Sequence, residues 1–348
     1  MNPYVLTMFL LSLGLGTTLT FASSHWLLAW MGLEINTLAI IPLMAQHHHP
    51  RAVEATTKYF LIQATAAAMI LFASTTNAWL LGEWNITQLT HPTATTMAMM
   101  ALALKVGLAP MHLWLPEVLQ GLDLTTGLIL STWQKLAPFA LIMQIAHSTN
   151  STILITLGIL STFIGGWGGL NQTQLRKILA YSSIAHLGWM IIIIKFAPQL
   201  TMLTLGTYII MTSTAFLTFK MAMTTKINTL ALSWSKNPTL AVITTLTLLS
   251  LAGLPPLTGF MPKWLILQEM TNQGLPLTAT LTALSALLSL YFYLRLCYTM
   301  TLTISPNTNN ASTPWRLPNT QPTLPLATFS TMTLMLLPIT PAFLALFY

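Results

Sequence analysis

The chain has 348 residues, of which 54% are hydrophobic and only 5% are charged, and its mean hydropathy is +0.69. Soluble domains carry about 25% charged residues, so this composition excludes a soluble protein and predicts one that spans a bilayer. The net charge of +7 does not indicate a nucleic-acid partner, because the basic residues are scattered over short loops rather than gathered in a patch.

Apolar segments long enough to cross a membrane recur along the whole chain, separated by short polar connections. We expect eleven helices, with boundaries good to about three residues. They cover residues 3–21, 25–45, 57–80, 93–120, 125–146, 150–170, 177–196, 198–223, 238–270, 276–300 and 324–347. The sequence therefore predicts an all-α, polytopic membrane protein with a single membrane domain, residues 1–348.

The segments at 93–120 and 238–270 are overlong, and they share a proline-containing motif at a constant offset of 146 residues. Proline lacks a backbone N–H, so each motif is expected to break its helix. The residues expected at the breaks are Gly107, Pro110 and Pro116 in the first copy and Gly253, Pro255, Pro256 and Pro262 in the second. Broken helices in the two halves of a membrane protein are typical of a transport path. Chance is the alternative, because Gly-Leu-x-Pro arises easily in an apolar chain.

Basic residues near the ends of the predicted helices indicate how the chain crosses the membrane. With the N-terminus inside, nine of them fall at inside loops or helix ends, and only Lys195 falls outside. The nine are Arg51, Lys58, Arg176, Lys177, Lys220, Lys226, Lys236, Arg295 and Arg316. An odd number of helices then places the C-terminus outside. Because the two broken segments are five crossings apart, we expect inverted repeats at about 3–146 and 150–300, followed by a C-terminal helix at 324–347.

Four ionisable residues lie within the apolar spans, where no loop can account for them: Glu34, Lys105, Lys135 and Lys263. A lysine or aspartate at the centre of a membrane helix costs about 2.5–3.5 kcal/mol on insertion scales. Burial favours the neutral form of lysine, whereas a nearby carboxylate favours the ammonium. A lysine whose distance to Glu34 changes can therefore take up and release a proton. We predict that these four residues translocate protons.

Histidines and hydroxyl groups form a second set of candidates. His112 lies inside the first break, and His186 lies in the middle of a predicted helix, where either can relay protons near neutral pH. A hydrogen-bonded packing histidine is an equally good interpretation of each. Tyr181, Ser182 and Ser183 are expected to hold water near His186.

The sequence gives little sign of a metal or cofactor site. His47, His48 and His49 are consecutive, but consecutive side chains on a helix do not converge on one ion, so we favour an interfacial loop. Cys297 is the only cysteine, which excludes an internal disulfide and a cysteine-ligated cluster within this chain. We expect no metal and no redox cofactor to be bound by this chain.

Four stretches resemble the antiporter-like subunits of respiratory complex I. They are KVGLAPMHLWLPEVLQG at 105–121, TWQKLAP at 132–138, NQTQLRKILAYSSIAH at 171–186 and GLPPLTGFMPK at 253–263. The similarity covers essentially the whole chain. Bacterial relatives have fourteen helices, so the eleven expected here resemble the shortened animal mitochondrial form.

The resemblance implies specific roles. Glu34 would pair with Lys105, Lys135 would be the central lysine, and Lys263 would lead to the exit side. NADH, FMN, iron–sulfur clusters and ubiquinone would bind elsewhere in the complex. Other membrane-arm subunits, accessory subunits and membrane lipids, with cardiolipin a candidate, would be the partners. The location would be the mitochondrial inner membrane, with the N-terminus in the matrix and the C-terminus in the intermembrane space.

Two other functions fit the same residues. One is a stand-alone cation/proton antiporter built on the same scaffold. The other is a membrane scaffold whose buried charges are inert. Co-purification with a large NADH-oxidising assembly separates the complex I subunit from the antiporter, and proton translocation after lysine replacement separates both from the scaffold.

Overall fold

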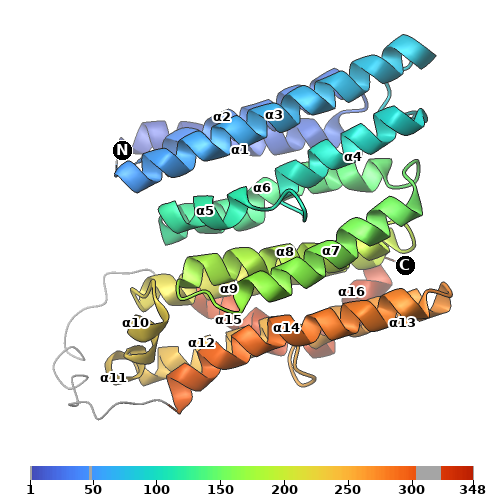
Figure 1. The fold of residues 1–348 in the computed structure, drawn as a ribbon. Helices are drawn as coiled ribbons and strands as arrows, with labels where there is room; N and C mark the ends of the chain where they lie inside the picture. Colours follow the sequence, from blue (N-terminus) through green and yellow to red (C-terminus); the bar gives the residue numbers. More distant parts are fainter. Residues whose placement is uncertain (1, 47–48, 303–322, 348) are drawn as a thin grey trace. The chain divides into compact units, whose positions relative to one another are not determined.

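The computed structural model describes residues 2–46, 49–302 and 323–347 (Figure 1). Within these residues the chain is built of helices joined by short connections, and its only β-type pairings are two isolated bridges, His25 with Asn85 and Gln174 with Lys226. The predicted all-α fold is confirmed. The chain divides into two compact units, residues 1–158 and 159–348.

The first unit is a bundle in which α3 contacts α2, α4 and α5, while α6 contacts α1, α2 and α4. Its helices are α1 (Pro3–Ala22), α2 (Trp26–Met44), α3 (Pro50–Leu81), α4 (Pro92–Val106), α5 (Trp114–Gly121) and α6 (Leu124–Ile145). Helix α7 (Ser151–Gly169) begins in this unit and ends in the second. The α1–α2 and α3–α4 connections meet at one end of the bundle, where the rings of His25 and Trp84 stack with centroids 5.4 Å apart.

The second unit is organised around α9, which contacts α8, α12, α13 and α15. Its helices are α8 (Leu175–Ile193), α9 (Pro198–Met221), α10 (Ile227–Ala231), α11 (Ser233–Lys236), α12 (Pro238–Ala252), α13 (Phe260–Asn272), α14 (Pro276–Thr301), α15 (Leu324–Met335), the 3₁₀ helix η3 (Leu337–Ile339) and α16 (Thr340–Phe347). Apolar side chains of α8, α9, α13 and α14, among them Trp189, Leu200 and Ile266, pack together in one core cluster.

Proline and hydroxyl residues are placed where an apolar environment tolerates them. Helices α1, α3, α4, α9, α12 and α14 begin with proline, at the position where the missing N–H has no intrahelical partner in any case. Threonine and serine hydroxyls inside the helices donate to the carbonyl three residues earlier, as Thr244 does to Ala241 at 2.7 Å. Local bonding of this kind satisfies each hydroxyl without water.

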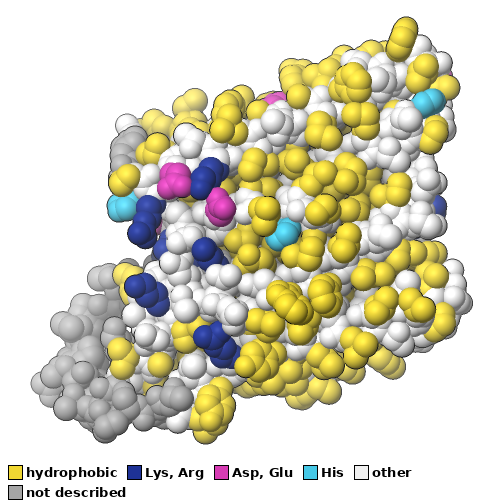
Figure 2. All heavy atoms as spheres, viewed as in Figure 1, with side chains coloured by type: hydrophobic (Ala, Val, Ile, Leu, Met, Phe, Trp, Pro, Cys, Tyr) yellow, Lys and Arg dark blue, Asp and Glu magenta, His cyan; other side chains and the backbone are white. Residues whose placement is uncertain are grey.

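Large apolar side chains point outward along these helices, which is how a protein meets lipid rather than water. On α14, Leu277, Leu284 and Leu287 are 58–69% exposed. Figure 2 shows hydrophobic side chains spread across the visible face, with most of the visible charged side chains toward its left edge. Seven of the described helices are long and apolar enough to cross a membrane: α1, α2, α3, α6, α7, α9 and α14. The polytopic membrane fold is confirmed, whereas the count of eleven spans is not.

Two of the expected helices differ from the prediction, and the short helices α10 and α11 lie where only a connection was expected. The helix expected at 57–80 begins at Pro50, where His49 caps it by accepting the Arg51 N–H at its Nδ1 atom, 3.3 Å away. The helix expected at 324–347 is interrupted by η3. Pro338 lies inside η3, and its missing N–H and bulky ring account for the interruption.

Candidate functional site

The first broken helix ends at Val106 and restarts at Trp114. Gly107 adopts φ +87°, a conformation that glycine enters without steric cost. The N–H groups of Gly107 and Leu108 both donate to the Ala103 carbonyl at 2.9 Å, which closes the last turn of α4. Lys105 therefore lies in the final turn of a half-helix, close to the negative end of its dipole.

The second broken helix repeats this geometry at the predicted offset. Gly253 adopts φ +84°, and the N–H groups of Gly253 and Leu254 both donate to the Leu249 carbonyl, at 3.1 and 3.3 Å. Helix α12 ends at Ala252, and the chain restarts as α13 at Phe260. The predicted broken helices are confirmed. Pro116 and Pro262 each occupy the first turn of the restarted helix, where a missing N–H is harmless.

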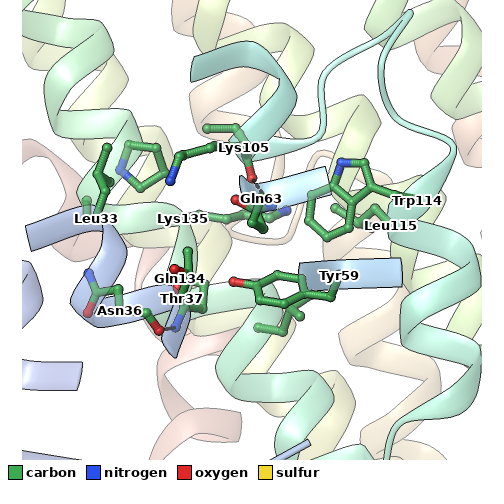
Figure 3. Close-up of a pocket in the computed structure, with 14 residues that line it drawn as sticks. Leu33, Asn36, Thr37, Tyr59, Gln63, Lys105, Trp114, Leu115, Gln134 and Lys135 are labelled. Carbon is green, nitrogen blue, oxygen red and sulfur yellow. Dashed lines mark hydrogen bonds between the residues drawn. The ribbon is translucent and has the colours of Figure 1, made fainter. Parts of the chain in front are cut away.

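Lys105 and Lys135 line one cavity in the first unit. Both are buried, with exposed fractions of 6% and 3%. The walls come from α2, α3, α4, α5 and α6, and the space can hold a water molecule. Its polar lining, besides the two lysines, consists of Asn36, Thr37, Tyr59, Gln63, Trp114 and Gln134. Figure 3 shows Lys135 among these side chains and the Tyr59 hydroxyl directed toward Thr37 and Gln134.

Glu34 lies on α2, one residue from the cavity wall, and is half-buried. Its carboxylate accepts a hydrogen bond from the Thr37 hydroxyl at 3.1 Å, and Thr37 lines the cavity. Glu34 is also close enough to Lys105 and Tyr59 to act on each electrostatically. The Lys105 ammonium has no hydrogen-bond partner among the residues that the structure describes. Within the described residues, Glu34 and Lys105 are therefore electrostatic neighbours that are not hydrogen-bonded to each other.

Pro138 changes the backbone beside Lys135. It lies inside α6, three residues after the lysine, and also lines the cavity. Because proline cannot donate, the Gln134 carbonyl loses its intrahelical partner at this point. The Gln134 amide in turn donates to the Asn36 carbonyl at 3.2 Å, which joins α6 to α2.

A second cavity, in the second unit, brings together His186 of α8 and Lys263 of α13, with Thr204 and Thr207 of α9 in its wall. This space also has room for water. The partly buried Lys263 donates from Nζ to the Ala252 carbonyl at 2.8 Å. It thereby caps the end of α12 and neutralises the negative end of that half-helix.

The remaining candidates lie apart from the two cavities. The Ser182 and Ser183 hydroxyls are buried and donate to their own helix, to Leu179 and Ala180 at 2.8 and 2.7 Å. Tyr181 packs against Gly168 of α7, where any larger residue would collide with its ring. His112 is buried in the first break, with Nδ1 3.2 Å from the Pro110 carbonyl oxygen. Water held by the two serines near His186 stays a prediction.

Two buried tyrosines were not among the candidate residues predicted from the sequence. Tyr208 of α9 lies within hydrogen-bonding reach of Ser183, and its ring centroid is 5.7 Å from that of His186. Tyr293 of α14 lies close to Ser182, but its hydroxyl has no hydrogen-bond partner within the described part of the chain. Both tyrosines lie within predicted apolar spans, and a polar hydroxyl in such a span was the feature of the sequence that could have identified them.

An ion-pair cluster at the start of α3 was also not predicted from the sequence. Lys58 Nζ lies 2.7 Å from Glu54 Oε1 and 2.9 Å from Glu117 Oε2, so it links α3 to α5. All three side chains are substantially exposed. The cluster therefore belongs to one end of the bundle rather than to its interior.

Metal-binding residues do not converge within the described ranges, where no three His, Cys, Asp or Glu side chains are grouped for an ion. His49 instead caps α3, while His47 and His48 lie outside those ranges. Cys297 is buried and its thiol points to the Thr245 carbonyl, 3.7 Å from Sγ.

Fold and site together define a class of polytopic membrane proteins in which a lysine that lines a cavity accompanies each of two broken helices. Residues 23–289 match the family described as NADH:quinone oxidoreductase/Mrp antiporter, and residues 290–344 match NADH dehydrogenase subunit 2 C-terminus. The chain is 76% identical to NADH-ubiquinone oxidoreductase chain 2 of Carassius auratus and 74% identical to that of Oncorhynchus mykiss, over 99% of each chain. The chain therefore belongs to the chain 2 branch of the NADH:quinone oxidoreductase/Mrp antiporter family.

Solved structures show the same fold. A chain of respiratory complex I from Thermus thermophilus superposes with a TM-score of 0.87 at 27% identity, over 99% of this chain and 80% of that one. A chain of the Mrp complex from Dietzia superposes with a TM-score of 0.82 at 18% identity, over 97% of this chain and 76% of that one. The expected resemblance to the antiporter-like subunits of complex I is confirmed.

Proposed function

We propose that this chain is a membrane-arm subunit of the proton-translocating NADH:ubiquinone oxidoreductase and that it carries protons through its buried lysines. Near-identity in length and 76% sequence identity with a chain 2 relative support the first part. The second part rests on the cavity that Lys105 and Lys135 share, beside Glu34.

The cavity has the parts that proton transfer needs. Two lysines can bind a proton, a nearby carboxylate can stabilise the charged form, and the space between them can hold water that conducts the proton. Charge in such a site is costly unless it is used or compensated, which makes intramembrane lysines functional by default. Motion of the Lys105 ammonium toward or away from Glu34 changes its readiness to hold a proton.

In this proposal, Glu34, Lys105 and Lys135 serve the first unit, and Lys263 with His186 serves the second. The negative end of α12, which now holds the Lys263 ammonium, would release it when the proton leaves. His112, Tyr181, Ser182 and Ser183 are secondary candidates, whose positions apart from the two cavities make them weaker ones.

Orientation follows the distribution of basic residues. In the second unit the 170–175 and 222–227 connections pair through Leu175 N–H to the Thr225 carbonyl at 3.1 Å, and Arg295 donates to the Leu170 carbonyl at 2.6 Å. Arg176, Lys177, Lys226 and Arg295 thus lie at one end of the second unit, whereas Arg316 lies outside the described residues. This supports a matrix-facing N-terminus and a C-terminus in the intermembrane space. Vertebrate relatives support the mitochondrial inner membrane as the location. Repeats at about 3–146 and 150–300 running in opposite directions belong to the same proposal.

The partners in this proposal are other membrane-arm subunits, accessory subunits and lipids, with cardiolipin a candidate. NADH, FMN, iron–sulfur clusters and ubiquinone would bind to other chains, leaving proton transfer to this one. A stand-alone antiporter is less well supported, because the Mrp chain shares the fold at only 18% identity.

The test has two parts. The chain should co-purify with an NADH-oxidising assembly, whereas a stand-alone antiporter would purify without it. In vesicles containing that assembly, Lys135→Ala should lower proton uptake per NADH oxidised while the assembly stays intact. Unchanged proton uptake per NADH oxidised would indicate that the buried charges are inert and would favour the scaffold function.

A further inference from the structure

The carbonyl groups at the end of α4 are occupied by side chains from two other helices. The indole Nε1 of Trp114, on α5, donates to the Leu104 carbonyl at 3.1 Å. The amide Nε2 of Gln63, on α3, donates to the Lys105 carbonyl at 3.4 Å, drawn as the dashed contact in Figure 3. A helix end leaves its last carbonyls without intrahelical donors, so these two side chains supply the missing hydrogen bonds.

The end of α12 in the second repeat is capped at another carbonyl and by another kind of donor. At the offset of 146 residues, Phe260 stands where Trp114 stands in the first repeat, and a phenyl ring has no N–H to donate. The ammonium of Lys263 binds the carbonyl of Ala252, the last residue of α12, which corresponds to Val106 rather than to Leu104 or Lys105. The first-repeat residue equivalent to Lys263 is Glu117, which is engaged with Lys58 instead.

The consequence appears in the two lysines. Lys263 shows that a lysine ammonium can bind a carbonyl at the end of a half-helix. Where neutral donors occupy the carbonyls, the Lys105 ammonium has no hydrogen-bond partner among the described residues and faces the cavity. Charged hydrogen bonds are stronger than neutral ones, so an uncapped helix end would compete with Glu34 for the Lys105 ammonium.

We propose that Trp114 and Gln63 are positioning residues that occupy the carbonyls at the end of α4 and so keep the Lys105 ammonium available to the cavity and to Glu34. This rests on the proposed proton-carrying role of Lys105. Neither residue handles the proton in this scheme. Trp114 also packs its ring against Tyr59 at 5.8 Å, so a ring must remain at this position for the cavity wall to stay intact.

The experiment replaces the N–H and keeps the ring. Trp114→Phe reproduces the residue of the second repeat, and Gln63→Leu removes the other donor. In intact complex reconstituted into vesicles, each should slow proton uptake, by about tenfold if one charged hydrogen bond captures Lys105. The pH profile of uptake should also move upward, because a carbonyl-bound ammonium holds its proton more tightly. Trp79→Phe, at a side chain that is 87% exposed on α3, is the matched control and should leave both readouts unchanged.

Each outcome has one meaning. Slower uptake with a shifted pH profile supports the positioning role, whereas slower uptake with an unshifted profile indicates a purely structural role and overturns it. Normal uptake in Trp114→Phe and Gln63→Leu also overturns it. If Trp114→Phe does not assemble, Gln63→Leu decides alone. Lys105→Ala separates a failure of the proposed function from a failure of this inference. If Lys105→Ala pumps normally, the proposed function fails. If Lys105→Ala stops pumping while Trp114→Phe and Gln63→Leu pump normally, only this inference fails.

Discussion

The rings of His186 and Tyr208 lie 5.7 Å apart, on α8 and α9, beside the cavity that holds Lys263. Tyr208 reaches Ser183 on the same side. Tyr208 therefore contacts both a histidine of the Lys263 cavity and a serine of α8. A hydroxyl can both donate and accept, which is the property a proton relay requires.

Tyr208→Phe removes this hydroxyl and keeps the ring. We expect several-fold slower proton uptake with unchanged assembly, measured in vesicles as uptake per NADH oxidised. Tyr298→Phe, at a residue of α14 that is 58% exposed, is the control. Equal uptake in the two variants would place Tyr208 in the packing and outside the relay.

Tyr293→Phe separates function from stability. The Tyr293 hydroxyl is buried without a hydrogen-bond partner among the described residues, and an unsatisfied buried polar group costs about 1–3 kcal/mol. Removing it should therefore leave thermal stability the same or higher. If the hydroxyl serves the relay, proton uptake falls in the same variant. A loss of stability would show instead that the hydroxyl is bonded in the assembled complex.

Lys263→Arg tests whether this cation must release a proton. Arginine can still cap the Ala252 carbonyl but does not deprotonate in proteins. We expect assembly to survive and proton uptake to fall strongly. Lys263→Met should lower both, because the carbonyl at the end of α12 then has no donor. Normal uptake in the arginine variant would limit Lys263 to a capping role.

Gly259→Ala should damage the second break. A Cβ at this position would overlap the Ser250 carbonyl, which is backbone and cannot turn aside. Overpacking of this kind costs about 1–3 kcal/mol. Gly206→Ala on α9 is the matched control, because its Cβ would have nothing within 4 Å. The thermal midpoint of the purified complex and the yield of assembled subunit should fall for the first variant alone, and equal yields would refute the close approach.

Segments of helix could be predicted from the sequence because apolar runs and proline positions are local properties. The two breaks were predictable for the same reason, since Gly107 and Gly253 stand before prolines in matching motifs. The early start of α3 was missed because Arg51 and Glu54 resemble a loop until Glu117, far along the chain, supplies a partner for Lys58. The break at Pro338 was not predicted, although a proline inside a helical segment indicates a break.

The site was predictable only in part. Lys105 and Lys135 stand out because charge is rare in an apolar span, but their shared cavity depends on how α4 and α6 pack. Tyr59, Gln63 and Trp114 are ordinary residues in the sequence and acquire meaning only from the carbonyls and rings they contact. The hydrogen bond from Lys263 to the end of α12 likewise depends on how the chain turns between α12 and α13.

The most direct measurement is the number of protons taken up per NADH oxidised by the intact complex carrying Lys105→Ala in this chain, in sealed vesicles. Lys105 is buried, faces the shared cavity and lies within electrostatic reach of Glu34, so its loss should lower that number while the complex still assembles and oxidises NADH. An unchanged number of protons per NADH would contradict proton transfer through these lysines.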